Sequence, residues 1–466
     1  MYDIIIQNAK IVSPETTVSG DVAIRGERIA ALLEPESGAP ASRTIDASGN
    51  YLLPGLIDPH THIEHMYKPE LYTNDDFYTA TASMAIGGVT SIIDFAIQLP
   101  EVSPIEILEK RLGQAAKAVT DYAFHSCFIN GNDETLNQIG ELVGRGVPSI
   151  KIFMAYRSRG RQCDDGVVLA ILEEAKKHGA LVGAHTENGD IIDYLVAKAV
   201  RNGQTSAIYH ALTRPHYTEE ECMRRALFLA KVTDAPFYDF HMSIGSGVDV
   251  MREARAAGRP VYAETLTHYL TLTKEVLNRP DGINFICSPP MRDKEDIEAL
   301  WQGLAEGTIS TTASDHCSFN TELKKQGENS FDKVPNGVCG AEFRLPVLFS
   351  EGVNKGRLSI NRFVAVTSTN AARIFGMYPQ KGIIAQGSDA DLVLIDPDRE
   401  KTLSVKDSLI GLDWSTFDGV RVKGVPTLTM LRGKVIAENG KFTGQKGDGK
   451  FLKRRIDPDV LRYPVV

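Results

Sequence analysis

Two histidines separated by one residue end an apolar run near the start of the chain. His60 and His62 close the segment GLIDPHTH, which follows Tyr51-Leu52-Leu53 and is typical of the end of a buried strand. Side chains two residues apart in a strand face the same side, so the two imidazoles point together, as two metal ligands must. Histidines at a strand end also occur as plain polar residues, so the motif predicts a metal site only if further ligands converge on it.

Further residues of the ligand type lie near the ends of later apolar segments. Taken singly, each has an ordinary explanation, because a buried histidine can be a hydrogen-bonded core residue and an aspartate can cap the following helix. Taken together with the first pair, they make four histidines, one aspartate and one lysine, and this set favours a metal centre. The additional candidates are Lys151 in SIKIFMAY, His185 in ALVGAHTEN, His241 in PFYDFHMS and Asp315 in TISTTASDH.

The type and number of these residues indicate two divalent ions. Neutral imidazoles and a carboxylate suit borderline cations, with zinc first. A single catalytic zinc usually has about three protein ligands, whereas two ions about 3.5–4 Å apart would use the whole set. Two cations need a bridging anion, and a free ammonium at Lys151 would repel them.

The candidate ligands need a frame that brings strand ends together. Near-continuous apolar segments alternate with amphipathic patterns such as GVVLAILEEAKKHG, which indicates a parallel sheet covered by helices. Eight such units predict an α/β fold with a (β/α)₈ barrel over residues 55–375, whose active site lies at the carboxyl ends of the strands. The expected strands are 55–62, 90–97, 121–128, 149–156, 180–188, 236–243, 260–266 and 308–316.

Both ends of the chain have a different pattern of apolar residues from the barrel region. Residues 1–54 and 376–443 hold short alternating segments broken by turns, so we expect them to join in one flanking β-sandwich domain. The tail, residues 444–466, has few apolar anchors and is expected to contact a neighbouring subunit. Its basic residues are expected to form a solvated or interface patch, and they are Lys450, Lys453, Arg454 and Arg455.

Composition excludes several classes of partner. A net charge of −9 argues against nonspecific nucleic-acid binding, and the absence of a long apolar run argues against a membrane span. The beginning of the chain does not read as a signal peptide. The six cysteines form no CxxC pair, so we expect free thiols in a reducing cytoplasm.

Along nearly its whole length the chain resembles the cyclic amidohydrolases, specifically the dihydropyrimidinase and hydantoinase group. The resemblance implies that Lys151 is carboxylated to N6-carboxylysine and bridges two metal ions, most simply zinc, with manganese as an alternative. His60, His62 and Asp315 would then complete one metal site, and His185 and His241 the other. The matching motifs are PGLIDPHTH, IGGVTSIIDFA, SIKIFMAY, AHTENGD, CSPPMR, SDHCSFN, KVPNGVCGAEFR, FVAVTSTNAARIFGMYPQKG and GSDADLVLIDP.

The resemblance also implies a reaction. A hydroxide held between the two metals would attack a carbonyl of a cyclic imide or amide, and Asp315 would act as general base and then acid, giving an N-carbamoyl amino acid. Tyr156 would donate a hydrogen bond to the developing oxyanion, and the backbones of Ser288 and Asn336 would hold the imide edge of the ring. From the residues alone, Tyr156 could equally pack on the rim, and Asn336-Gly337 could be an ordinary turn. The family resemblance further implies a homotetramer.

Several related activities and roles fit part of the pattern. Dihydroorotases typically carry an arginine two positions after the second histidine to bind a carboxylate. This chain has Glu64 there, which argues against a dihydroorotase. An allantoinase is compatible with the ligand set, while a metal-free scaffold protein and a single-metal deaminase are the rivals from other classes. The loop after Tyr156 carries Arg157, Arg159 and Arg161, which could favour an acidic or polar exocyclic substituent or could simply form a solvated loop.

Overall fold

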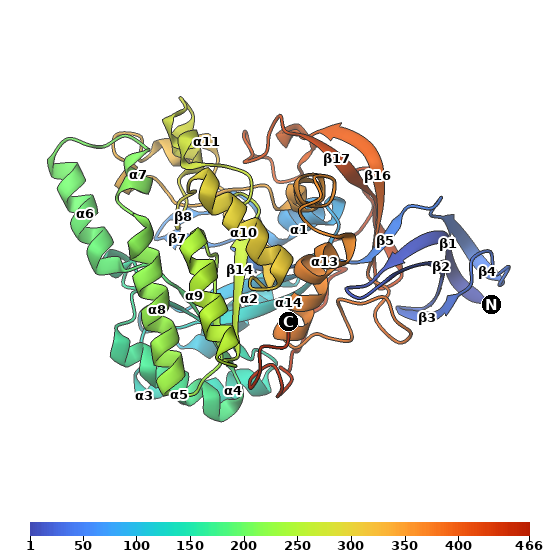
Figure 1. Cartoon of the computed structure of the whole chain (residues 1–466), viewed down its shortest axis with the longest axis horizontal. Coiled ribbons are helices and arrows are strands. Elements are labelled where there is room, and N and C mark those ends of the chain that lie inside the picture. The colour runs from blue at the N-terminus through green and yellow to red at the C-terminus, as the bar shows by residue number, and fades with distance from the viewer.

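Eight parallel strands form the centre of the molecule. In the computed structural model, which describes residues 1–466, they pair in the order β15-β14-β13-β12-β11-β10-β9-β6. Each is followed by helical segments that return the chain to the next strand (Figure 1), so the predicted (β/α)₈ barrel is confirmed. The strands are β6 (Leu56–Thr61), β9 (Val89–Ile97), β10 (Asp121–Cys127), β11 (Ser149–Phe153), β12 (Leu181–His185), β13 (Phe237–Asp239), β14 (Val261–Leu266) and β15 (Thr311–Ala313).

The barrel closes at the carboxyl ends of its last and first strands. Thr61 and His316 pair in parallel register, and the His62 amide donates to the His316 carbonyl at 2.7 Å. The Ser314 amide donates to the Asp58 carboxylate at 3.1 Å. These bonds lie on either side of Asp315 and hold that residue beside the first strand.

Helices cover the outside of the barrel, and several of them begin at a residue whose side chain caps the first turn. In α5, for example, Asp164 accepts from the Val167 amide, and Gly179 ends the helix with a left-handed backbone. The helices are α1 (Phe77–Ile86), α2 (Pro104–Ala115), α3 (Asp133–Leu136), α4 (Ile139–Gly144), α5 (Asp165–His178), α6 (Gly189–Arg201), α7 (Tyr209–Leu212), α8 (His216–Val232), α9 (Gly245–Ala256), α10 (Lys294–Glu306), α11 (Thr321–Lys325), α12 (Arg344–Leu348), α13 (Ile360–Val364) and α14 (Asn370–Ile374).

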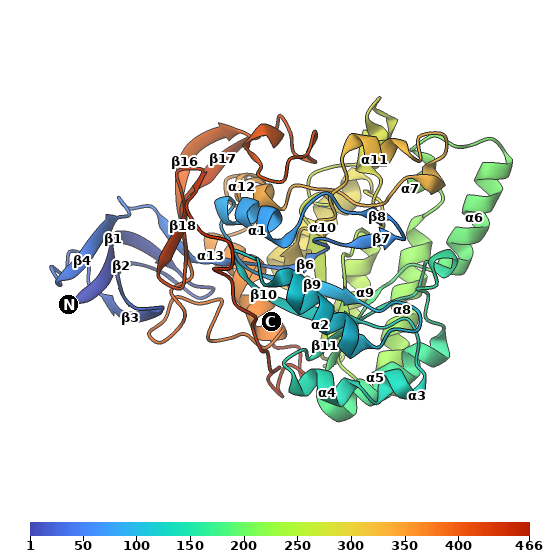
Figure 2. The ribbon, with the colours of Figure 1, turned by 180° about the vertical axis from the view of Figure 1, so that it is seen from behind.

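Strands from both chain ends form a second sheet at one side of the barrel (Figure 2). It has nine strands in one continuous hydrogen-bonded sheet, and strands of both chain ends contribute to one hydrophobic cluster, as in a sandwich. The strands are β1 (Tyr2–Val12), β2 (Thr17–Arg25), β3 (Arg28–Leu33), β4 (Ala41–Asp46), β5 (Tyr51–Pro54), β16 (Leu392–Thr402), β17 (Arg421–Leu431), β18 (Lys434–Glu438) and β19 (Lys441–Phe442); the remaining pair, β7 (Met66–Lys68) and β8 (Leu71–Tyr72), forms a hairpin of its own.

The apolar run that precedes the histidine pair does not form one strand. Residues Tyr51–Pro54 pair with β1 and β16 in the flanking sheet, whereas Leu56–Thr61 pair with β9 in the barrel. Gly55 alone separates the two strands, and a Cβ at this position would lie 2.1 Å from Thr90 Oγ1. The run is continuous in hydrophobicity because both sheets bury it, so hydrophobicity alone does not reveal the break.

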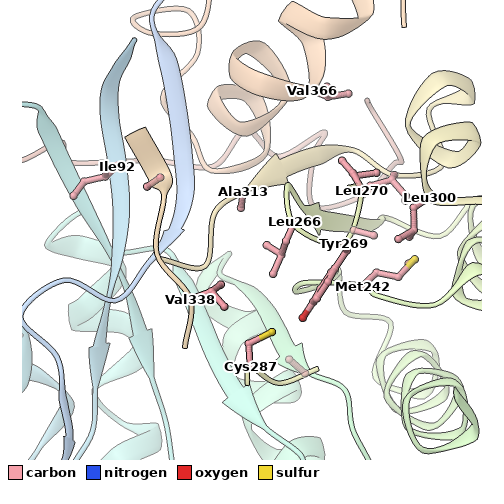
Figure 3. Close-up of a cluster of buried hydrophobic side chains, with 14 of the residues drawn as sticks. Ile92, Met242, Leu266, Tyr269, Leu270, Cys287, Leu300, Ala313, Val338 and Val366 are labelled. Atoms are coloured by element: carbon pink, nitrogen blue, oxygen red, sulfur yellow. The ribbon is translucent and has the colours of Figure 1, made fainter. Parts of the chain in front are cut away.

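The largest hydrophobic cluster lies between the strands and the surrounding helices and contains 74 buried residues. Figure 3 shows part of this cluster, where Met242, Leu266 and Tyr269 lie near Cys287. All six cysteines are buried and unpaired, as expected. None of the helices combines the length and the apolar character needed to cross a membrane.

The tail has more apolar anchors than the sequence suggested. Leu452, Ile456 and Val460 are buried in a cluster with barrel residues. Arg454 is not part of a solvated patch, because its side chain is only 3% exposed and donates to the Phe124 carbonyl and, at 2.9 Å, to Ser149 Oγ. The prediction for Arg454 was therefore wrong: its guanidinium binds polar groups on the barrel strands.

A buried ion cluster joins the barrel to the flanking sheet. Lys381 is 2% exposed and lies 2.5 Å from Asp121, 2.5 Å from Asp391 and 2.9 Å from Asp389. Asp121 begins barrel strand β10, and Asp391 precedes strand β16 of the flanking sheet. The three carboxylates raise the pKa of Lys381 in spite of its burial, so the lysine stays charged and holds them together.

We predict that Lys381→Met destabilises the protein by about 3–5 kcal/mol, because it leaves Asp391 buried without an ion-pair partner. Asp121 and Asp389 would keep only Arg432 and Arg28, respectively. The midpoint of urea denaturation, followed by circular dichroism, measures the effect. Lys423→Met is the matched control, since Lys423 is half exposed and pairs with Asp398 at the surface. Equal midpoints for the two variants would contradict the prediction.

Candidate metal centre and active-site pocket

The two histidines of the first strand and the aspartate after the last strand converge. His60 Nε2 and His62 Nε2 each lie 3.1 Å from the same atom, Asp315 Oδ1. Their ligand atoms all lie within 4.8 Å of one another. The structure thus brings together three of the predicted residues, although His60 and Asp315 are far apart in sequence.

The other three predicted ligands form a second group in the same pocket. His185 Nδ1 lies 2.9 Å from His241 Nε2, and Lys151 Nζ lies 3.5 Å from that same nitrogen. Lys151 is fully buried, with its ammonium 3.9 Å from the centre of the Phe240 ring. The pocket that contains both groups is lined by all six predicted ligands.

Two glutamates that the sequence reading missed fix the proton positions of the histidines. Glu264 on β14 accepts from His60 Nδ1, and Glu187 after β12 accepts from His185 Nε2 at 2.9 Å. Each carboxylate holds the proton on the outer ring nitrogen and leaves the lone pair of the other nitrogen directed into the pocket. A carboxylate within an otherwise apolar strand is the signal that could have found Glu264.

The charges in the pocket call for a cation. With its Nδ1 proton held by Glu264, His60 turns a lone pair towards the Asp315 carboxylate, which is repulsive unless a proton or a metal lies between them. Burial alone would lower the pKa of His60, but Asp315 and Glu264 raise it to about 9. His62 Nδ1 and His241 Nδ1 are buried without a hydrogen-bond partner. This donor set therefore fits divalent metal ions.

Lys151 is placed where its charge is costly. Burial lowers the pKa of Lys151 to about 8, and the nearby carboxylates of Glu264 and Asp315 only partly oppose this. Its neutral amine is therefore more accessible near neutral pH than that of an exposed lysine. A neutral amine is the form that reacts with carbon dioxide.

Three residues of the pocket adopt a left-handed backbone at strand ends. The φ angles are 71° for Tyr156, 49° for His241 and 49° for Asp315. Non-glycine residues rarely adopt this conformation, and it concentrates at functional sites. All three side chains line the pocket.

The predicted substrate contacts line the same pocket as the ligand candidates, and the Tyr156 ring lies 4.8 Å from the His185 ring. Tyr156, Ser288 and Asn336 all line this pocket, and Asn336 Nδ2 donates to Ser288 Oγ at 2.9 Å. The Asn336 amide donates to Tyr67 Oη at 2.9 Å, so its N–H is already used within the protein. Only the weak donor Cys317 Sγ, 3.9 Å away, faces the Asn336 carbonyl, which leaves it available as an acceptor.

The arginine loop divides into two parts. Arg157 is exposed and pairs with Asp190 at 2.5 Å, outside the pocket lining. Arg159 and Arg161 line the pocket and contact Tyr67. The sequence reading placed all three arginines beside the pocket, and the structure places two of them there.

Nearly the whole chain matches known proteins. The Amidohydrolase family model matches residues 51–436. The D-hydantoinase of Ralstonia pickettii is 43% identical over 459 residues, which cover 97% of this chain and 99% of that protein. The D-hydantoinase of Geobacillus stearothermophilus is 40% identical over 471 residues, covering 98% of this chain and 99% of that protein.

This chain belongs to the amidohydrolase family. A solved dihydropyrimidinase from Brevibacillus agri superposes with a TM-score of 0.94 at 41% identity and covers 97% of this chain and 98% of its own. An L-hydantoinase (dihydropyrimidinase) from Arthrobacter aurescens gives a TM-score of 0.90 at 33% identity, with 97% and 99% covered. Membership of this family and the converging ligand groups support divalent metal binding.

We predict that Glu264→Gln weakens metal binding by about 10- to 100-fold. A glutamine amide can donate to His60 Nδ1, which would move the ring proton to the nitrogen that faces the pocket. Chelator competition followed by metal analysis measures the affinity. Tyr238→Phe is the matched control, because it removes another hydrogen bond to Glu264, of 2.9 Å, and leaves His60 with its carboxylate. Unchanged affinity in Glu264→Gln would contradict this role.

Proposed function

We propose that the protein is a metal-dependent hydrolase that opens the ring of cyclic amides, dihydropyrimidines or 5-substituted hydantoins, to give N-carbamoyl amino acids. The observation that carries the proposal is the convergence of six ligand-type residues in one pocket of an amidohydrolase-family barrel. The full-length relatives and solved structures named for hydantoinase or dihydropyrimidinase activity support the same reaction.

The proposed metal centre holds two divalent ions, zinc or alternatively manganese. His60, His62 and Asp315 would hold one ion, and His185 and His241 the other, with carboxylated Lys151 between them. Carboxylation replaces a costly buried ammonium by an anion, which explains why a lysine occupies this position. When bound, the metals supply Lewis-acid chemistry and lower the pKa of a bound water molecule towards neutral pH.

The residues of the chain would handle the proton and the substrate. Asp315 lies at the junction of the two histidines and would take a proton from the attacking water and return it to the leaving ring nitrogen. The Tyr156 hydroxyl would donate to the oxygen of the attacked carbonyl. Burial and the nearby Glu187 charge raise the pKa of Tyr156, so it stays a donor at neutral pH.

The backbone of Ser288 and the carbonyl of Asn336 would hold the imide edge of the ring. Both residues line the pocket beside Tyr156, and the Asn336 carbonyl can accept from a ring N–H. Because the reactive carbonyl lies next to that N–H in a cyclic imide, this contact would place the carbonyl towards the metal side of the pocket.

A substrate panel tests the proposal. The metal-replete protein should hydrolyse dihydrouracil, hydantoin or a 5-substituted hydantoin, with the N-carbamoyl product identified by mass spectrometry. Allantoin in the same panel tests for an allantoinase. Removing metal with a chelator should abolish turnover, and added zinc or manganese should restore it. A metal-free, well-folded protein without turnover on any member would reject the proposal and favour a scaffold role.

Lys151 would bridge the two metal ions, and its removal tests that role. Lys151→Ala should lower kcat by at least about 10³-fold, because the centre loses its anionic bridge, and short carboxylic acids added to the assay should restore part of the activity. Steady-state kinetics with and without acetate or propionate measures this. Lys151→Met is a control that fills the space and leaves no room for the added acid. Full activity in Lys151→Ala would favour a single-metal mechanism.

We also propose how the parts of the chain are used. Residues 55–375 would form the catalytic domain, residues 1–54 and 376–443 the flanking β domain, and residues 444–466 a subunit contact in a homotetramer. Exposed apolar side chains on α6 and α8, including Tyr194, Phe228 and Val232, support an oligomer. Light scattering would give the subunit number. Six unpaired cysteines support a cytoplasmic location.

A further inference from the structure

Two unneutralised guanidinium groups form one wall of the active-site pocket. Arg159 and Arg161 lie on the loop after β11, which begins with the 3₁₀ turn Arg157–Arg159. Both side chains are half-buried and line the same pocket as the metal-ligand candidates. They are the only arginines in that lining.

Neither guanidinium forms an ion pair with a carboxylate of the chain. Arg159 donates to Tyr67 Oη and stacks on its ring at 4.1 Å, and Arg161 lies 3.5 Å from the Tyr67 carbonyl. Acidic residues of the surrounding elements are already paired with other bases: Glu64 with Lys117, Asp94 with Arg111, and Asp190 with Arg157.

Asp315 does not neutralise this wall either. Its carboxylate faces His60 and His62, and in the proposed function it binds metal. Burial and the neighbouring charge of Arg159 lower the pKa of Arg161, as expected when like charges lie close together without a counter-ion. The two arginines thus leave a positive charge surplus on a wall of the pocket that the substrate enters.

The contacts of the two arginines fix their orientation. Tyr67 belongs to hairpin strand β7, and its hydroxyl accepts from both Arg159 and the Asn336 amide. One tyrosine therefore links the arginine loop to a residue that would hold the imide edge of the ring. An exocyclic group on a ring held by Asn336 lies within the same small pocket as these guanidinium groups.

We propose that the preferred substrates are cyclic ureides whose exocyclic substituent carries a carboxylate, which Arg159 and Arg161 bind. This inference rests on the proposed function and specifies its substrate class. Guanidinium groups bind carboxylates with charge-assisted, often two-point hydrogen bonds. In the reaction, the ring bond between C4 and N3 breaks, hydroxide from water joins C4, and N3 takes the proton. The product is an N-carbamoyl diacid, and the side-chain carboxylate is unchanged.

Two substrates of the same shape test the inference. The metal-replete enzyme is assayed with 5-(2-carboxyethyl)hydantoin and with its amide, 5-(2-carbamoylethyl)hydantoin. We expect kcat/KM to favour the acid by roughly 10- to 100-fold, which is the usual contribution of a hydrogen bond to a charged group. Raising the ionic strength should reduce turnover of the acid and leave the amide unaffected.

Variants assign the preference to the two arginines. Arg159→Gln and Arg161→Gln should each lower the acid-to-amide ratio by about threefold or more, chiefly through KM, and the double variant should bring it near one. Arg161→Lys keeps the charge and should keep most of the preference. Arg157→Gln is the matched control, because Arg157 lies on the same loop but pairs with Asp190 outside the pocket.

The outcomes separate this inference from the proposed function. Turnover of the amide and of unsubstituted hydantoin without preference for the acid would overturn the inference and leave the proposed function standing. Equal losses on both substrates in the arginine variants would also overturn it, since they would show a structural role for the loop. No turnover of any cyclic ureide by the metal-replete enzyme would overturn both.

Discussion

Hydrogen bonding between the last and the first strand of the barrel holds the catalytic pocket together. The His62 amide donates to the His316 carbonyl at 2.7 Å, and the pairing of Thr61 with His316 continues this contact. Asp315 lies within this closure and therefore reaches both histidines of the first strand, although about half of the chain separates them. The second ligand group depends on the same ring of strands, because its three members come from or follow β11, β12 and β13.

The closed ring also concentrates charge that the fold alone does not balance. Glu264 and Glu187 lie behind the ligands and hold the protons of His60 and His185 away from the pocket. Burying these carboxylates costs free energy in the metal-free protein. Bound cations would recover that cost, so metal binding and the stability of the barrel's polar end are coupled. The strained backbones of His241 and Asp315 fit this description, because the surrounding strands hold them in place.

The barrel and the ligand residues that converge at its strand ends can be predicted from the sequence, but the residues that hydrogen-bond to them cannot. The eight strands and the meeting of His60, His62 and Asp315 follow from the period-two pattern and from apolar segments that alternate with helices. The break at Gly55 cannot be predicted from this pattern, because the two sheets bury the apolar residues on both sides of it. The carboxylate of Glu264 stands out in its apolar strand, but the sequence does not show that His60 is its partner. Arg454 was missed because its partners are backbone and hydroxyl groups far away in the sequence. The different directions of Arg157 and Arg161 depend on contacts with Asp190 and Tyr67 that only the fold supplies.

Because only Gly55 separates β5 of the flanking sheet from β6 of the barrel, the flanking sheet restricts how far this first barrel strand can slide along its neighbour. Pro54 is paired in that sheet and Leu56 in the barrel, and a side chain at Gly55 would collide with Thr90. Since side chains alternate along a strand, a shift by one residue would turn His60 and His62 away from the pocket. The flanking sheet thus anchors the register of the first strand, on which the direction of both histidines depends.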